Sequence, residues 1–320
     1  IPAAPESGNQ ISVKCLPDGV GGLLVFWIES RLGNGLVNLF GQRLSASGQI
    51  LWGPGGRHLA DCFDYYRYPV VRLSEGMLAV VHNQELAGGQ GFSSYLRKLD
   101  SDGAFASDLL LEEKHSTDYP ILLINDSLGG VFAVWQNDTI KVQYQDEAGD
   151  AWTKPLTIWP GNTGSSTAPN AYACNAGPDG LFLAWCGYNP NTQGCDLQVQ
   201  RYDRKGEAGL PLPNVVLPVF GFYLEQMLPA RDGGFYFYAL NAVHKVSPLG
   251  ALQWRSEIPV NTHTGPFSFF VETEDSSMLA AYSANGMVFF DASGNILWNN
   301  TGNVANGNPF GLGGVCRSSD

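Results

Sequence analysis

The chain has 320 residues, a formal net charge of −12 and only 15% charged residues. The acidic balance argues against nucleic acid as a partner, because phosphate binding needs a basic patch, and no apolar run approaches the roughly 18 residues that a membrane-spanning segment requires. Frequent glycine (39 residues) and proline (19 residues), with 12% aromatic residues, favour an all-β class built from short strands and tight turns.

The first 52 residues contain the clearest copy of an internal repeat. A turn at Asp18-Gly19 precedes an apolar run at residues 23–27 (LLVFW), and the signature QRLSASG at residues 42–48 then leads to Trp52. A continuous apolar run of this length is typical of a strand that is buried on both faces. The glycine that ends the signature supplies the positive φ that a tight hairpin requires. The unit therefore predicts a four-stranded sheet whose second strand is the apolar run.

Five further copies follow along the chain at a spacing of about 50 residues, which is the period of a propeller blade. Their predicted second strands span residues 77–82, 131–135, 181–185, 235–239 and 278–282. Their third-strand signatures end at Gly103, Gly149, Gly206, Gly250 and Gly294. The sequence thus predicts a single β-propeller domain over residues 1–320, with about six four-stranded blades. A seventh, incomplete blade is the alternative.

The pattern at residues 18–52 resembles the repeats of propeller-type secreted and surface proteins of Bacteroidetes and related bacteria. In that group the unit runs from DGxGG through a strand ending in Trp to QRL, Gly and Trp. Residues 179–206 are a second close match, whereas Ala239 and Tyr282 replace the strand-end Trp in the last two units. The resemblance implies the propeller fold and a secreted location, and it carries no catalytic residues.

The six cysteines form no CxxC motif and no Cys/His cluster with zinc spacing. Cys186 and Cys195 flank a short polar loop, which suits a disulfide that clamps a hairpin. Cys15 and Cys316 lie near opposite ends of the chain, and a disulfide between them would lock a ring closed. Buried thiols are the alternative. Because disulfides indicate an oxidising compartment, we expect an extracellular or cell-surface location, with the periplasm as the alternative.

In a propeller with this strand order, the loops between second and third strands share one face with the loops between blades. These loops are the longer ones here, and function on a rigid scaffold usually lies on such loops. Aromatic, amide and charged side chains on this face are typical of polar-ligand recognition, and they give a candidate ligand-binding set: Trp27, Glu29, Arg31, Asp64, Tyr65, Tyr66, His82, Gln84, Asp118, Tyr119 and Tyr188. The alternative is that the tryptophans pack between blades and that the tyrosines pack within ordinary loops.

Metal-binding and catalytic motifs are not found in the sequence. None of the five histidines has HxH or HExxH spacing. Residues 100–103 (DSDG) are similar to part of a calcium loop, but turn chemistry explains them as well. We therefore expect no cofactor and keep calcium as the one alternative. His82 stands where four other units carry an aromatic residue, and a general-base role would require a partner group.

The leading interpretation is a binding or interaction module for a glycan or protein partner, without nucleic-acid binding or membrane insertion. The first alternative is an enzyme (a glycoside hydrolase, lyase or esterase), because a fold does not by itself fix a function. Glycosidase chemistry would need two carboxylates, for which the candidates are Glu29, Asp64, Glu85 and Asp118. The second alternative is a structural domain of a larger surface assembly.

Overall fold

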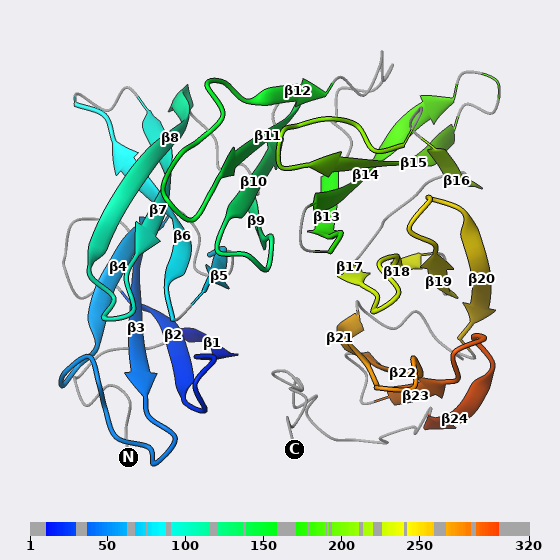
Figure 1. The fold of residues 1–320 in the computed structure, drawn as a ribbon, viewed down its shortest axis with the longest axis horizontal. Coiled ribbons are helices and arrows are strands. Elements are labelled where there is room, and N and C mark those ends of the chain that lie inside the picture. Colours follow the sequence, from blue (N-terminus) through cyan, green and yellow to red (C-terminus); the bar gives the residue numbers. More distant parts are fainter. Residues whose placement is uncertain are drawn as a thin grey trace. The chain divides into compact units, whose positions relative to one another are not determined.

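A computed structural model describes residues 11–29, 37–62, 68–74, 76–87, 91–115, 121–136, 139–158, 171–177, 180–189, 191, 194–210, 214–219, 226–239, 242–258, 267–282 and 286–300. The chain forms two compact units, Ile1–Trp159 and Pro160–Asp320, called here the first and second unit. Strands make up the regular structure in Figure 1, and the described residues contain no helix.

Within the described part of the first unit, twelve strands form three four-stranded antiparallel sheets. Sheet 1 contains β1 (Ile11–Pro17), β2 (Leu23–Glu29), β3 (Val37–Leu44) and β4 (Arg57–Cys62). Sheet 2 contains β5 (Val70–Arg72), β6 (Leu78–Glu85), β7 (Phe92–Leu99) and β8 (Phe105–His115). Sheet 3 contains β9 (Ile121–Asn125), β10 (Val131–Gln136), β11 (Ile140–Gln145) and β12 (Leu156–Ile158).

The described residues of the second unit repeat this arrangement three more times. Sheet 4 contains β13 (Ala171–Asn175), β14 (Gly180–Asn189), β15 (Gly194–Asp203) and β16 (Asn214–Val219). Sheet 5 contains β17 (Gln226–Pro229), β18 (Phe235–Ala239), β19 (Ala242–Val246) and β20 (Leu252–Glu257). Sheet 6 contains β21 (Phe267–Glu272), β22 (Met278–Tyr282), β23 (Gly286–Phe290) and β24 (Ile296–Asn300).

Each sheet is an antiparallel meander in which neighbours in sequence are neighbours in space. This is the blade of a β-propeller, so the predicted fold class is confirmed, with six four-stranded sheets among the described residues. The six predicted apolar runs all fall on second strands, from β2 to β22. In β10, for example, Val131, Phe132 and Ala133 are all fully buried, as expected for a strand covered on both faces.

The turn between the third and fourth strands has one geometry in all six sheets. In sheet 2, the Gly103 N–H donates to the Asp100 carbonyl and the Asp100 N–H donates to the Ala104 carbonyl. The Asp100 carboxylate accepts the N–H groups of Asp102 and Ala104 at 2.9 and 2.8 Å. Gly103 has φ +70°, a region that side chains disfavour. The repeated Gly signature is therefore a turn signature.

Tryptophans that follow these turns connect one sheet to the next. The Trp52 indole N–H donates to the Ser101 carbonyl in the sheet 2 turn at 3.1 Å. Likewise, the Trp254 indole N–H of sheet 5 donates to the Ala292 carbonyl in the sheet 6 turn at 3.2 Å. A Cβ at Gly103 would lie 3.2 Å from the Trp52 ring. The glycine thus serves both the turn and the close approach of the ring.

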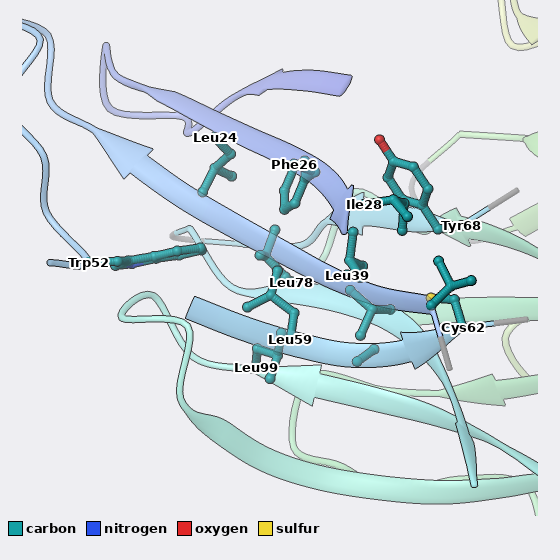
Figure 2. Packing of buried hydrophobic residues seen from close by; sticks show 13 residues of the cluster. Leu24, Phe26, Ile28, Leu39, Trp52, Leu59, Cys62, Tyr68, Leu78 and Leu99 are labelled. Atoms are coloured by element: carbon teal, nitrogen blue, oxygen red, sulfur yellow. The ribbon is translucent and has the colours of Figure 1, made fainter. Parts of the chain in front are cut away.

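The core lies between successive sheets of each unit. Figure 2 shows Phe26 and Ile28 of β2 packed with Leu39 of β3 and with residues of sheet 2, such as Leu78. Equivalent clusters join sheets 2 and 3, sheets 4 and 5, and sheets 5 and 6. A fully buried Leu or Phe side chain contributes about 1.5–3 kcal/mol, so these clusters fix the scaffold.

A glutamine at the start of each close repeat signature braces the segment that leads from the turn to the fourth strand. Gln42 is fully buried, and its amide donates to the Gly53 carbonyl while its oxygen accepts the N–H groups of Arg43 and Trp52. Gln200 makes a similar set of bonds: its oxygen accepts the N–H groups of Arg201 and Leu210, and its amide donates to the Leu210 carbonyl. In sheet 5 the signature places His244 at this position.

Candidate functional site

The strand-end tryptophans are buried. Trp27, Trp135 and Trp185 are 2%, 1% and 2% exposed, as the packing interpretation predicts. Trp27 stacks on Phe40 with ring centroids 6.3 Å apart. Its indole N–H and that of Trp185 have no hydrogen-bond partner among the described residues. A role for Trp27 as a ligand contact stays a prediction.

Several predicted ligand-binding residues lie outside the described residues, namely Arg31, Asp64, Tyr65, Tyr66, Asp118 and Tyr119. For Tyr188 the structure describes only the backbone, which pairs with Cys195 in the β14–β15 hairpin. Gln84 is exposed near the end of β6. The remaining predicted residues, Glu29 and His82, belong to a group of polar side chains that the structure does describe.

A row of polar residues crosses sheet 1 at the end where β2 finishes. Glu29 of β2 lies opposite Asn38 of β3, and Asn38 lies opposite Asp61 of β4. The Asn38 amide donates to Asp61 Oδ1 at 2.8 Å. Glu29 is buried and Asn38 is fully buried. Because buried polar groups are costly unless hydrogen-bonded, the bond between Asn38 and Asp61 stabilises this row.

Two histidines contact Asp61 from different sheets. His58 Nε2 lies 3.1 Å from Asp61 Oδ1, and the Asp61 backbone N–H donates to His82 Nδ1 of sheet 2, also at 3.1 Å. Burial opposes ionisation of Asp61, but the hydrogen bonds from His58 and Asn38 hold its pKa below the ordinary value. Burial lowers the pKa of His82, and Arg97 acts in the same direction.

The polar residues continue across sheet 2 at the same end. Asn83 of β6 lies opposite Ser94 of β7, whose hydroxyl donates to Asn83 Oδ1 at 2.6 Å. Ser94 in turn lies opposite Glu112 of β8. Glu112 Oε2 accepts the Trp135 indole N–H at 2.8 Å and the Lys141 ammonium at 2.6 Å, both from sheet 3. The carboxylate thus bridges sheets 2 and 3.

We call this set the polar belt, and it contains Glu29, Asn38, Asp61, His82, Asn83, Ser94, Glu112 and Lys141. All eight lie toward the loop end of the first three sheets. Sequence reasoning predicted Glu29 and His82 and missed the other six. Five of the missed residues lie on third and fourth strands and Asn83 lies near the end of β6, and the strand register is what shows that they line up.

The opposite end of the sheets is stabilised by turn carboxylates. Asp18 accepts the N–H groups of Val20 and Gly22, and Asp126 accepts those of Leu128 and Gly130. Asp100 serves its own turn in the same way. No group of three or more metal-ligating side chains occurs among the described residues. The DSDG segment is a turn in this structure, and calcium binding elsewhere stays an alternative.

The described residues test the cysteine predictions in part. Cys186 is disulfide-bonded, but the side chain of Cys195 lies outside the described residues, so their pairing stays a prediction. Cys174 is buried and carries a free thiol. The predicted Cys15–Cys316 disulfide stays a prediction, because Cys316 lies outside the described residues.

Comparison with known proteins supports the fold alone. No family model matches the chain, and no curated protein matches it. Among solved structures, prolyl oligopeptidase B from Galerina marginata has a TM-score of 0.55 at 12% identity, covering 90% of this chain and 41% of that one. The chain thus spans about two-fifths of that peptidase.

Two other solved structures match over most of both chains. BBS1N, solved in complex with ARL6DN, has a TM-score of 0.46 at 13% identity and covers 93% of this chain and 82% of its own. BamB from Moraxella catarrhalis has a TM-score of 0.45 at 13% identity, and the match covers 92% of this chain and 76% of that one.

Within the described segments, no helix has the length and hydrophobicity to cross a membrane.

Proposed function

We propose that this β-propeller is a secreted or cell-surface binding module that recognises a polar partner through the polar belt. The observation that carries the proposal is the burial of hydrogen-bonded polar side chains at one end of the first unit. Asn38 is 0% and Ser94 is 2% exposed, where apolar residues would pack at lower cost. Convergent polar groups on an otherwise apolar scaffold are typical of ligand sites.

The chemistry of the belt favours a hydroxyl-rich or cationic ligand. It presents carboxylate oxygens from Asp61 and Glu112, whose side chains are 18% and 20% exposed, while Glu29, Asn83 and Ser94 are buried. Carboxylates accept hydrogen bonds from hydroxyl or ammonium groups. A glycan is therefore the ligand class to test first, and a protein surface with exposed Lys or Ser side chains is the second.

The first test is binding of the full chain to a broad glycan array, with and without calcium. Asp61→Asn keeps the size of the side chain and an acceptor for Asn38 but removes the charge. Asp102→Asn is the matched control, because Asp102 is an exposed carboxylate at the opposite end of sheet 2. We expect a glycan signal that Asp61→Asn lowers at least tenfold and Asp102→Asn preserves.

If no glycan on the array binds, the next measurement is binding to protein partners with the same two variants, Asp61→Asn and Asp102→Asn. Equal binding by both variants would contradict a site at the belt. Tyr65→Ala and Tyr119→Ala then test the predicted loop residues directly. A ligand lost with these two variants but kept in Asp61→Asn would place recognition in the loops instead.

An enzyme remains the second candidate because one observation favours it. Glu29 and Asp61 lie in one cross-strand row with Asn38 between them. Two strand spacings of about 4.8 Å place their backbones about 10 Å apart, and glycosidases use a pair of carboxylates flanking the scissile bond. Release of reducing sugar from any glycan that binds, abolished in both Glu29→Gln and Asp61→Asn, would support this candidate.

A further inference from the structure

We infer that His82 makes the junction between sheets 1 and 2 a proton-sensitive contact. In this inference the neutral ring holds β4 by accepting the Asp61 N–H, and protonation of Nδ1 removes that hydrogen bond. The contact is a property of the fold and does not depend on the proposed binding function.

The edge position of β4 explains why a side chain is needed here. Among the described residues, β4 is the outermost strand of sheet 1 and pairs with β3 alone. Backbone groups on the other side of an edge strand have no strand partner. The Asp61 N–H instead donates to His82 Nδ1 of β6 at 3.1 Å. A partly buried N–H that loses its acceptor destabilises the contact, so this bond matters for how closely β4 packs on β6.

The bond requires one protonation state of the ring. A nitrogen that accepts an N–H must carry a free lone pair, so the His82 proton resides on Nε2. When the ring becomes imidazolium, both nitrogens are donors, and Nδ1–H would face the Asp61 N–H. Two donors cannot share a hydrogen bond. The ring or the strand must then move.

The charges around His82 come from three strands. Among the described residues, Asp61 and His58 face it from β4, Arg97 from β7 and Asp108 from β8. The ring of Tyr95 lies 6.2 Å from the imidazole. Burial and Arg97 disfavour the imidazolium, while Asp61 and Asp108 favour it. The burial of the ring thus keeps the accepting form dominant near neutral pH and places the change on the acid side.

Two neighbouring contacts do not share this sensitivity. Arg97 also ties sheet 2 to β4, through the Leu59 carbonyl at 3.4 Å, and Asp108 holds the same guanidinium at 2.9 and 2.8 Å. Arginine keeps its charge at every pH of the test. His58 Nε2 can donate to Asp61 Oδ1 from a neutral or a charged ring, so this contact does not require one protonation state. Of these three contacts, the one made by His82 is the contact that acid weakens.

The test is amide hydrogen exchange of the full chain from pH 8 to pH 5, corrected for the intrinsic pH dependence of exchange. We expect protection of the Asp61 amide to fall about tenfold as His82 titrates, with the same midpoint as the His82 ring resonances. Protection of the central strand β10 should stay constant over this range. Constant Asp61 protection across the titration of His82 would overturn the inference.

Variants separate the His82 contact from general acid effects. His82→Gln supplies an acceptor at every pH, so protection of the Asp61 amide should become independent of pH. His82→Leu removes the acceptor, so the amide should be weakly protected at every pH while β10 stays protected. His58→Gln is the matched control and should keep the wild-type pH dependence. Loss of the dependence in His58→Gln and its survival in His82→Gln would assign it to His58 and refute the role of His82.

Discussion

His244 is a buried histidine without a hydrogen-bond partner, and it should make the fold sensitive to acid. It lies on β19, is 0% exposed and stacks on Phe237 with ring centroids 4.4 Å apart and planes 4° apart. Neither ring nitrogen has a hydrogen-bond partner among the described residues. The nearby Ala242 and Phe237 backbones favour the charged ring, yet burial, aided by Arg255, lowers its pKa to about 4.

The sign and size of the effect follow from linkage. The unfolded chain binds a proton at His244 below its ordinary pKa of 6.5, whereas the folded chain does so only below about 4. Between these values the unfolded state binds more protons, so the free energy of unfolding falls as the pH falls. A separation of this size corresponds to a loss of about 3 kcal/mol, complete near pH 4.

The assay is equilibrium urea unfolding at pH 7, 6, 5 and 4, for wild type and His244→Leu. Carboxylates elsewhere contribute equally to the pH dependence of both proteins, so the difference between the two free energies of unfolding isolates the effect of His244. Leucine removes two unpaired polar atoms, so the variant should be at least as stable at pH 7. Between pH 7 and pH 4, the free energy of unfolding of the variant should then fall by about 3 kcal/mol less than that of wild type.

A second variant follows from the repeat. His244→Gln restores the residue found at this position in sheets 1, 3 and 4, and it should also remove the acid-dependent difference. The reasoning would be refuted if wild type and variant differed in free energy of unfolding by the same amount at pH 7 and at pH 4. So would an NMR titration that gives the His244 ring a pKa at or above 6.5.

Three further predictions concern the first unit. Gln42→Leu should lower the free energy of unfolding by about 3 kcal/mol in urea, because three hydrogen bonds of a buried amide are lost; the exposed Gln49→Leu is the control, and equal midpoints for the two would contradict the bracing role. Gly41→Ala should cost about 1–3 kcal/mol in thermal unfolding, because the new Cβ would lie 2.8 Å from Leu59 Cδ1 and 3.1 Å from the Trp52 ring; no change in melting temperature would count against this close packing. Glu112→Leu should cost about 2 kcal/mol more than Glu112→Gln, because only glutamine keeps an acceptor for the Trp135 indole; identical stabilities, or an unshifted Trp135 indole resonance in Glu112→Leu, would exclude the bridge.

The repeat could be predicted from the sequence because its signals are local. The apolar run of β10 and the glycine at Gly103 each specify structure within a few residues. Dependence on local signals also limited which residues of the site could be predicted. Glu29 was predicted from its place in a loop after a second strand and His82 from the end of a second strand, but Asn38 and Asp61 carry no local signal that places them beside those residues.

The sequence by itself determined the blade, its turns and the six-fold repetition, because strand burial and turn chemistry depend on neighbouring residues. The tertiary structure alone decided that Asp61 meets His58 and His82, since those contacts depend on strand register within sheet 1 and on the packing of β4 against β6. Contacts between residues distant in the chain are set by packing, and a single sequence does not encode them locally.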